Sequence, residues 1–518
     1  MTSDPTVRRD AEPVTFGSAS GRWILLAAVL GSGLAGIDAT VVNVALPAVG
    51  ESLDAGFAGL QWTVTAYTLT LASFILLGGS LADRFGRRRI FLTGVVWFAA
   101  ASLLCGLAPG IGTLIAARAV QGVGAALLTP GSLALIQASF VPEDRTRAIG
   151  AWSGLSGIAT AAGPFLGGWL VEQVSWRWVF LVNVPLAALV IVVALRHVPE
   201  SRSSAPSSGV DVWGALLGVA ALAGVTYALV EQPGQGSGAA PVVIAAVVGL
   251  GAGVAFVLVE GASRKPMLPL SIFRSTQFTA ANLVTFAVYG GFGAVFFLLV
   301  IQLQVVAGFS PVQAGVSILP ITLVMLALSS RSGALAYRIG PRWQMSLGPV
   351  VCAAGLVLML RIGPQAAYLT EVLPGVAVFG LGLAIMVAPL TATALAAAPA
   401  THAGLASGVN NAVARAAGLL AIAVLPAVAG ISGDDYTRPA VFDAGFERSL
   451  WAAVAVLLLG GAIAAMTISS TTLSEAADDP ASNATPAEPV PSHPRPTSHC
   501  AVGAPPLRVE CGPPVGEE

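Results

Sequence analysis

The sequence predicts an all-α integral membrane protein, built from two bundles of six helices with two further helices inserted between them. Three observations lead to this prediction: the composition, the number of long apolar segments, and a cationic turn that occurs twice. Hydrophobic residues account for 55% of the 518 residues and charged residues for only 10%, whereas about a quarter of the residues in soluble domains are charged. The composition therefore excludes an ordinary soluble domain.

Fourteen apolar segments are long enough to cross a bilayer as helices, because about 20 residues span the hydrocarbon core. They are too long for the strands of a membrane β-barrel. The first segment follows Arg8 and Arg9, as in a signal peptide, but it continues past Pro47 and we interpret it as an uncleaved helix. The predicted spans are 23–47, 60–80, 90–108, 111–133, 148–171, 178–196, 213–231, 239–259, 278–305, 312–334, 343–362, 370–397, 405–430 and 449–469.

Basic residues indicate the orientation of these spans, since loops on the cytoplasmic side of a membrane are enriched in Lys and Arg. With a cytoplasmic N-terminus, the outer loops contain only Arg177, Arg361, Arg438 and Arg448, and acidic residues predominate there. The other loop arginines and Lys265 fall on the inner side. An even number of spans returns the chain to that side, so we expect a multi-pass protein with both termini in the cytoplasm.

A repeated turn indicates that the chain has two related halves. Six residues of the first copy recur 254 positions later, and parallel half-repeats are an established transporter architecture. The second copy has no acid, because Tyr337 stands where the first copy has Asp83. The repeated pairs are Gly79 and Gly333, Leu81 and Leu335, Ala82 and Ala336, Arg84 and Arg338, Gly86 and Gly340, and Arg88 and Arg342.

These features divide the chain into five parts. Two apolar segments between the halves have no counterpart in the repeat, so we interpret them as inserted helices. The last part is rich in Pro, Ala, Ser and Glu and has too little apolar surface to offset its ordering entropy, so we expect disorder. The parts are a cytoplasmic N-terminal segment at 1–22, a six-helix bundle at 23–200, two inserted spans at 201–265, a second six-helix bundle at 266–470 and a cytoplasmic tail at 471–518.

The first copy of the turn forms a short and strongly cationic hairpin between two spans. Glycines at both ends allow the helices to approach and turn, and a single acid lies among four arginines. We expect this acid to organise the arginines and the helix ends at a cytoplasmic gate. The residues of the predicted gating motif are Gly79, Asp83, Arg84, Gly86 and Arg88.

Asp38 and Arg118 lie inside predicted spans, where a charge costs a few kcal/mol and marks a functional site by default. Asp38 lies roughly 13 Å and Arg118 roughly 10 Å from the outer end of its helix, at a rise of 1.5 Å per residue. These depths allow direct or water-linked pairing. Burial favours a neutral carboxyl group and a nearby guanidinium favours the charged form, so the pair is our candidate protonation switch. A static ion pair between two helices is the structural alternative.

Other spans contain further candidate residues. In the fifth span, the pattern G-P-x-x-G-G combines glycines that allow close helix contact with a proline that permits a kink. Three polar residues are candidates for facing a substrate, although Arg415 can equally form a structural pair. Glu231 is interpreted as a solvated charge at a membrane boundary. The pattern comprises Gly163, Pro164, Gly167 and Gly168, and the polar candidates are Asn43, Gln121 and Arg415.

No metal site or catalytic constellation is predicted. The histidines and cysteines of the tail, at 493, 499, 500 and 511, have irregular spacing, and metal sites require a recognisable ligand arrangement. The sequence has no pattern that pairs a nucleophile with a base. We therefore expect a protein that is not an enzyme and that has no cofactor.

Together these motifs resemble those of the 14-helix drug:proton antiporters of the major facilitator superfamily, over roughly residues 20–470. The cationic hairpin matches the helix 2–3 motif of that family, and Gly163–Gly168 matches its helix 5 motif. Arg118 with Gln121 matches the helix 4 motif, and the run DATVVNVALP that begins at Asp38 matches the helix 1 motif. The resemblance implies the major facilitator fold. It also implies that the helix 4 arginine acts in proton coupling, the helix 5 motif in export direction and the helix 2–3 motif in gating.

The resemblance implies a proton-coupled antiporter that exports small, largely apolar organic compounds, such as drugs and antibiotics, across the bacterial cytoplasmic membrane. The proton gradient would be its energy source, and it would act as a monomer without a nucleic-acid partner. The alternatives are an uptake symporter or metabolite exporter of the same fold, and a membrane sensor that transports nothing. The helix 5 motif argues against uptake. A sensor that transports nothing does not explain why charged residues lie inside the membrane.

Overall fold

The computed structural model of the chain describes residues 13–202, 211–263, 266, 268–398 and 403–470. Fourteen helices in these ranges are long and apolar enough to cross a membrane, which confirms the predicted number of spans. The tail predicted at 471–518 and the first twelve residues of the predicted N-terminal segment lie outside the described residues.

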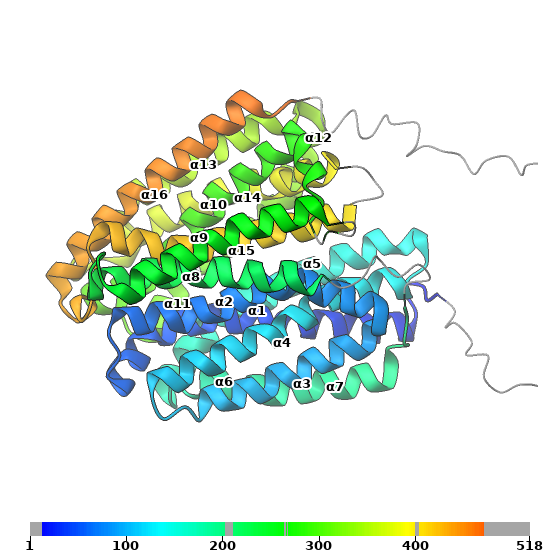
Figure 1. Cartoon of the computed structure of the whole chain (residues 1–518), viewed down its shortest axis with the longest axis horizontal. Helices are drawn as coiled ribbons and strands as arrows, with labels where there is room; N and C mark the ends of the chain where they lie inside the picture. The colour runs from blue at the N-terminus through cyan, green and yellow to red at the C-terminus, as the bar shows by residue number, and fades with distance from the viewer. Residues whose placement is uncertain (1–12, 203–210, 264–265, 267, 399–402, 471–518) are drawn as a thin grey trace, which may run out of the picture. The chain divides into compact units, whose positions relative to one another are not determined.

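The first six spans pack together. Among them, α4 contacts α2 and α3, and α1 contacts α5 and α7; these helices lie in the lower part of Figure 1. The predicted span at 178–196 is broken at Val182 into α6 and α7, which together form one span. The helices are α1 (Ala19–Leu53), α2 (Phe57–Phe85), α3 (Arg87–Gly106), α4 (Ile111–Ser139), α5 (Pro142–Gln173), α6 (Trp178–Leu181) and α7 (Asn183–His197).

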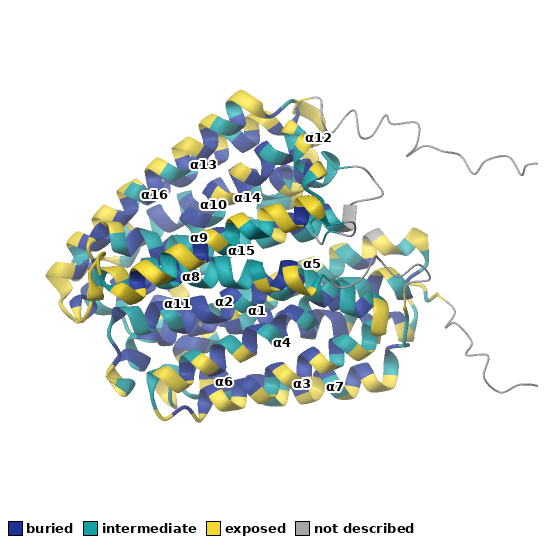
Figure 2. Cartoon of the chain, viewed as in Figure 1, coloured by how far each residue is buried: buried dark blue, intermediate teal, exposed yellow. Residues whose placement is uncertain are grey.

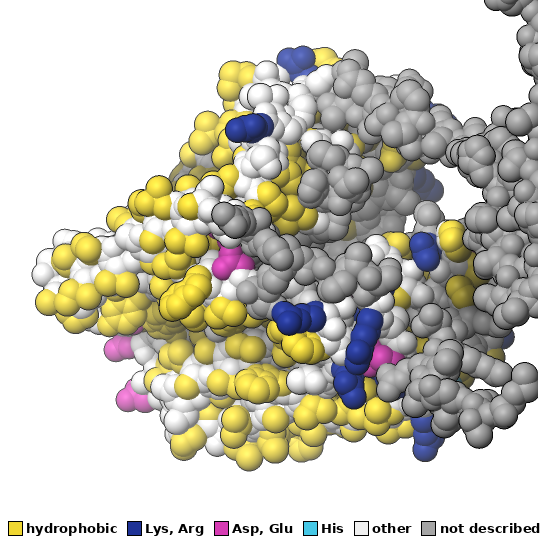
Figure 3. Space-filling model, turned by 45° about the vertical axis from the view of Figure 1, so that its right-hand side comes forward, with side chains coloured by type: hydrophobic (Ala, Val, Ile, Leu, Met, Phe, Trp, Pro, Cys, Tyr) yellow, Lys and Arg dark blue, Asp and Glu magenta, His cyan; other side chains and the backbone are white. Residues whose placement is uncertain are grey.

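Two helices, α8 (Val212–Gln235) and α9 (Ala240–Ala262), lie between the halves in the sequence. They pack against each other, and α8 also contacts α2 and α15. Large apolar side chains of α9, including Val247 and Leu250, are exposed, and Figure 2 shows exposed residues along the outer faces of the helices. Such a face suits contact with lipid, and hydrophobic side chains also cover most of the described surface visible in Figure 3.

The last six spans form a second group. Polar caps and prolines set several of its helix ends: Ser310 and Gln313 form a reciprocal capping box at the start of α11, and Pro320 lies at the break between α11 and α12. The elements are η1 (Leu270–Arg274), α10 (Thr276–Ile301), η2 (Gln302–Val306), α11 (Pro311–Ser317), α12 (Leu319–Ile339), α13 (Pro341–Met359), η3 (Tyr368–Val372), α14 (Leu373–Ala396), α15 (Ala403–Ala429), η5 (Asp435–Thr437) and α16 (Pro439–Thr467).

The second group repeats the packing of the first. Contacts of α14 with α12 and α13 match those of α4 with α2 and α3, and contacts of α10 with α15 and α16 match those of α1 with α5 and α7. Between the groups, α2 contacts α15, while α5 contacts α11 and α12. The repeat seen in the sequence at one turn therefore extends through the helical packing of both halves.

Hydrogen bonds join the two halves at the end that the sequence predicts to be outer. The side chain of Gln61 on α2 donates to the carbonyl of Ile422 on α15 at 2.7 Å. The hydroxyl of Tyr436 donates to the carbonyl of Ala55 at 2.9 Å. Because these bonds connect helix ends and loops of opposite halves, they close the predicted outer end.

Candidate functional site

The site centres on an ion pair inside the first group of helices. Nη1 of Arg118 on α4 donates to Oδ2 of Asp38 on α1 at 2.6 Å. Both side chains are enclosed, with exposed fractions of 1% and 0%. The structure thus brings together the two residues that the depth estimate placed at one level, and their contact is direct.

A shell of polar side chains completes this pair. Nε2 of Gln121 and Nδ2 of Asn183 donate to Oδ1 of Asp38 at 2.8 and 2.9 Å. The same Gln121 accepts from Nη1 of Arg118 at 2.5 Å and donates to Oγ of Ser102 at 2.7 Å. All of these side chains are buried. Both oxygens of the carboxylate therefore accept hydrogen bonds, as a buried charge requires.

Arg118 also has partners that do not depend on Asp38. Its Nε donates to the carbonyl of Thr63 on α2 at 2.9 Å. Its guanidinium lies over the ring of Tyr67, 4.3 Å from the centroid, and 5.6 Å from the ring centroid of Phe180. Cation–π contacts of this kind gain strength when they are desolvated. These contacts hold the guanidinium in place from two helices, α2 and α6.

Sequence reasoning missed Asn183, Ser102 and Tyr67 as members of this site. An amide in the middle of the apolar segment at 178–196 was a usable signal for Asn183, since a buried amide needs a partner. Ser102 and Tyr67 gave no comparable signal, because serine and tyrosine are common in membrane helices.

The fifth-span pattern lies against the helix that holds Asp38. A side chain at Gly163 would collide with the hydroxyl of Thr40, and a Cβ at Gly167 would lie 2.9 Å from the carbonyl of Val41. The hydroxyl of Thr40 in turn donates to the carbonyl of Thr160 at 3.2 Å. Small residues thus let α5 pack directly on α1, two residues along the chain from the acid.

The end of the same pattern reaches the other half of the molecule. A Cβ at Gly168 would lie 2.5 Å from the carbonyl of Pro311, and a side chain at Gly315 would collide with the carbonyl of Pro164. The pattern therefore contacts α1 on one side and α11 on the other.

The cationic hairpin differs in detail from the expectation. Among the described residues, Asp83 forms an ion pair with only one of the four arginines: its Oδ1 accepts from Nη2 of Arg87 at 2.9 Å. Glu200, beyond the end of α7, accepts from the backbone amides of Arg88 and Arg89 at 3.1 and 3.2 Å. The carboxylate of Glu200 thus caps the first turn of α3, where anions are favoured. Sequence reasoning assigned this organising role to Asp83 alone.

Both copies of the turn use glycine for the same reason. Gly86 has a φ of 114° and Gly340 a φ of 81°, which side chains with a Cβ rarely adopt. A Cβ at Gly86 would lie 2.6 Å from Oε1 of Glu200, and one at Gly340 would lie 2.7 Å from Cβ of Ser470. The second turn thus has a similar backbone conformation, but its glycine lies against a serine instead of an acidic side chain.

The remaining polar candidates lie apart from the ion pair. Asn43 is buried, and its Oδ1 has no hydrogen-bond partner among the described residues. Arg415 on α15 is half-buried, and its Nε has no partner among these residues either. Glu231 is not a simple solvated charge, because it accepts a hydrogen bond from Nε1 of Trp62 at 2.9 Å and so ties α8 to α2.

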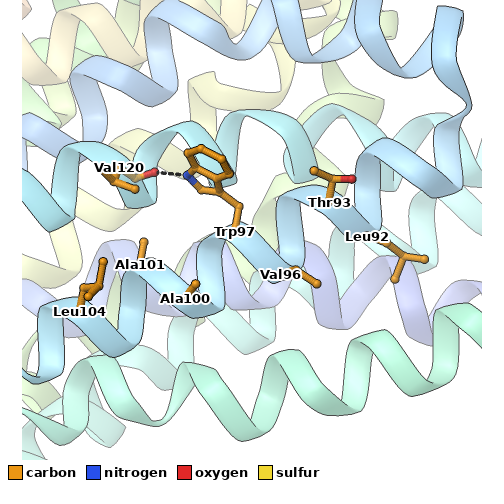
Figure 4. Close-up of a pocket in the computed structure, with 8 residues that line it drawn as sticks. All are labelled: Leu92, Thr93, Val96, Trp97, Ala100, Ala101, Leu104 and Val120. Atoms are coloured by element: carbon orange, nitrogen blue, oxygen red, sulfur yellow. Dashed lines mark hydrogen bonds between the residues drawn. The ribbon is translucent and has the colours of Figure 1, made fainter.

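A separate groove lies on the surface of the molecule along α3 and α4 (Figure 4). Its lining is almost entirely apolar, and the indole of Trp97 donates to the carbonyl of Val120 at 2.8 Å across it. It shares no residue with the ion-pair network. Among the described residues, no group of three or more His, Cys, Asp or Glu side chains has the arrangement of a metal site.

Comparison with known proteins identifies relatives over most of the chain. The family model described as Major Facilitator Superfamily matches residues 28–422. The puromycin resistance protein of Streptomyces alboniger is 38% identical over 505 residues, which cover 92% of this chain and 98% of that protein. The multidrug resistance protein Stp of Mycobacterium tuberculosis is 39% identical over 412 residues, covering 78% of this chain and 75% of that protein.

Solved structures match at the level of the fold. A peptide transporter crystallised with sulfate has a TM-score of 0.65 at 15% identity, and the match covers 88% of this chain and 98% of that chain. An inward-facing bacterial homologue of the human lysosomal transporter Spinster has a TM-score of 0.58 at 19% identity, covering 89% and 98%. At such identities the likeness concerns the arrangement of helices alone.

Proposed function

Since the chain belongs to the major facilitator superfamily, we propose that it exports small, largely apolar organic compounds from the cytoplasm in exchange for protons. Its relatives include proteins named for resistance to puromycin and methylenomycin A and for the export of tetracenomycin C, and we infer antibiotics as substrates of this chain. The observation that supports proton exchange is the enclosed pair of Asp38 and Arg118.

The geometry of the pair suits a protonation switch. A proton that reaches Asp38 turns an acceptor of three strong hydrogen bonds into a neutral acid, and Nη1 of Arg118 then loses its anionic partner. Gln121 and Asn183 can still donate to the carbonyl oxygen of the neutral acid. Arg118 keeps the carbonyl of Thr63. Each protonation state thus keeps hydrogen bonds to these neighbours but differs in the bond to Arg118, which gives the site two discrete states for a conformational equilibrium to follow.

The proposed cycle uses these states in sequence. Protonation from outside weakens the link between α1 and α4 and favours opening toward the cytoplasm. A substrate that binds from the cytoplasm or the inner leaflet then favours release of the proton inward. The hairpins between α2 and α3 and between α12 and α13 would act at the cytoplasmic gate. We propose a monomer in the bacterial cytoplasmic membrane, with cytoplasmic termini and with the proton gradient in place of any cofactor.

The test is export by the full-length chain in inverted membrane vesicles, with puromycin, tetracenomycin C and ethidium as probes. We expect at least one compound to accumulate only while a proton gradient is present, and a protonophore to abolish its accumulation. Asp38→Asn should lose this uphill transport at unchanged abundance. Asp54→Asn is the matched control, because Asp54 is an exposed residue with a φ of 49° at the end of the same helix, a conformation that asparagine tolerates.

Accumulation that persists without a gradient would contradict proton exchange. So would uphill transport by Asp38→Asn at the level of the Asp54→Asn control.

A further inference from the structure

We propose that Arg415, Tyr67 and the aromatic face of α10 form a subsite for a planar aromatic substrate that bears an acidic group. The inference deepens the proposed function by naming a substrate class, and it rests on that function only in taking the bound compound to be cargo. Four observations support it: an arginine without a counter-ion, a hydroxyl without a partner, a row of aromatic rings, and the position of that row in the repeat.

Arg415 lies near the middle of the 27-residue helix α15. The ion pairs of the described residues join Asp83 with Arg87, Arg88 with Glu200, Asp38 with Arg118, and Asp435 with Arg438, and none includes Arg415. Its Nε has no hydrogen-bond partner in this part of the chain. A cation within a membrane span is costly without compensation, so an anionic partner supplied by the substrate is the natural complement.

Two phenol groups lie near this guanidinium. Tyr67 is on α2 and Tyr289 on α10, and both helices pack against α15, which holds Arg415. Tyr67 is only 2% exposed, and its hydroxyl has no hydrogen-bond partner among the described residues. The Nε of Arg415 and the O–H of Tyr67 are both donors, and neither has an acceptor among these residues. One carboxylate or sulfonate can accept from both, because it has several oxygen lone pairs.

Aromatic rings continue from this point along α10. Tyr289, Phe292 and Phe296 follow one another at helical spacing, so they share one face of the helix. The rings of Phe292 and Phe296 are 4.4 Å apart, and Phe292 is stacked on Phe379 of α14 with their planes at 10°. The three α10 rings are only partly buried. Partly open rings of this kind can stack against a planar aromatic compound.

The repeat places this aromatic face opposite the proton site. Counted at the offset of 254, Phe292 is the counterpart of Asp38. The loop before α14 is longer than the loop before α4, and Gly382 packs on Cys352 as Gly124 packs on Phe98, so Val376 is the counterpart of Arg118. Where the first half has the acid and its arginine, the second half therefore has an aromatic ring and a valine. In this proposal the first half binds the proton and the second half binds the aromatic compound.

Tyr67 connects the two regions. Its ring lies beneath the guanidinium of Arg118 at 4.3 Å, while its phenol lies near both Asp38 and Arg415. An anion that accepts from the Tyr67 hydroxyl therefore binds one side chain away from the proton site. Arg415 at the same time disfavours dicationic compounds, so the subsite selects for acidic aromatic cargo.

The experiment measures equilibrium binding to the purified full-length chain in lipid nanodiscs, without a proton gradient. The two probes are anthraquinone-2-carboxylate and the neutral anthraquinone-2-carboxamide, which share the ring system and differ in charge. We expect the chain to bind the acid at least about tenfold more tightly. Arg415→Gln should weaken binding of the acid roughly ten- to hundredfold, as loss of a charged hydrogen bond does, and should change binding of the carboxamide less than about threefold.

Three further variants make the result specific. Arg415→Lys keeps the charge and should retain part of the preference for the acid. Tyr67→Phe removes one O–H and should cost the acid about tenfold; it replaces Arg415→Gln as the decisive variant if that protein is not recovered folded. Phe292→Leu should weaken binding of both probes by about three- to tenfold. Arg361→Gln changes an exposed arginine beyond α13 and is the control.

Equal affinity of the unmodified chain for both probes, or binding of neither, would overturn the inference. So would an equal loss for both probes in Arg415→Gln. Because binding is measured without a gradient, a failure of proton-driven export would overturn the proposed function and leave this result standing.

Discussion

The two halves of this transporter have the same helical packing but different interiors. The first half encloses Asp38 and Arg118 in a shell of hydrogen bonds, and the matching positions of the second half are Phe292 and Val376. The packing of α4 against α2 and α3 is nevertheless repeated by α14 against α12 and α13. The comparison teaches that the fold does not need the charges, since one half forms without them. Their presence in the other half therefore points to function.

The cytoplasmic turns repeat this contrast on a smaller scale. Both turn at a glycine with positive φ, Gly86 or Gly340. Among the described residues, only the first has carboxylates around the turn, where Asp83 binds Arg87 and Glu200 caps α3. Both halves thus share the glycine turn. In the described part of the chain, acidic side chains stabilise only the turn of the first half.

The largest effect should come from truncation of the two matched buried positions. Arg118→Ala leaves Asp38 buried without its partner, at a cost of about 3–5 kcal/mol, so uphill export should fall by about a hundredfold or more. Val376→Ala truncates the matched buried position of the second half and should change uphill export less than about threefold. Transport by both variants at matched abundance checks this expectation, and a similar loss in both would remove the contrast between the halves.

A double variant sharpens the same comparison. If Asp38 and Arg118 act as one unit, Asp38→Asn added to Arg118→Ala should reduce export by no more than about a further threefold, since groups in contact are not additive. Downhill exchange of substrate should persist in all three variants. Losses that multiply would show that the two residues act independently.

A smaller effect is expected at the two turns. Asp83→Asn removes the ion pair with Arg87, a partly exposed pair worth up to about 1 kcal/mol, and should lower the maximal transport rate about two- to fivefold. Tyr337→Phe at the matched position of the second turn should leave the rate unchanged. Initial rates over a range of substrate concentrations separate rate from affinity, and a pure loss of affinity in Asp83→Asn would contradict a role in gating.

The smallest effect concerns stability. Glu200→Gln weakens the anionic cap on α3 and should cost about 1 kcal/mol, measured as a lower midpoint of thermal unfolding in detergent. Ser470→Ala, at the residue that faces the second turn, should leave the midpoint unchanged. If Ser470→Ala lowered the midpoint by as much as Glu200→Gln or more, the two turns would be stabilised in the same way.

Much of this architecture could be predicted from the sequence, because membrane spans are set by length and apolarity. The pairing of Asp38 with Arg118 also followed from arithmetic, since both lie at known distances from helix ends. Family resemblance added the fold, which the family match confirms.

Contacts between residues far apart in sequence could not be predicted in the same way. Glu200 caps α3 from 112 positions away, and Ser102 binds Gln121 through a helix crossing that no local pattern specifies. The hydrogen bond between Trp62 and Glu231 was not predicted either, because only the docking of α8 on α2 brings the two side chains within reach. Local sequence patterns predict helices, whereas these contacts depend on how the helices pack against one another.

The central claim is that Asp38 exchanges its proton as substrate binds. It is tested most directly by recording the pH of a weakly buffered solution of the purified chain while a transported compound is added. Wild type should release protons in proportion to the substrate bound, and Asp38→Asn should bind the compound and release none. Proton release of equal size from Asp38→Asn and wild type would contradict the claim.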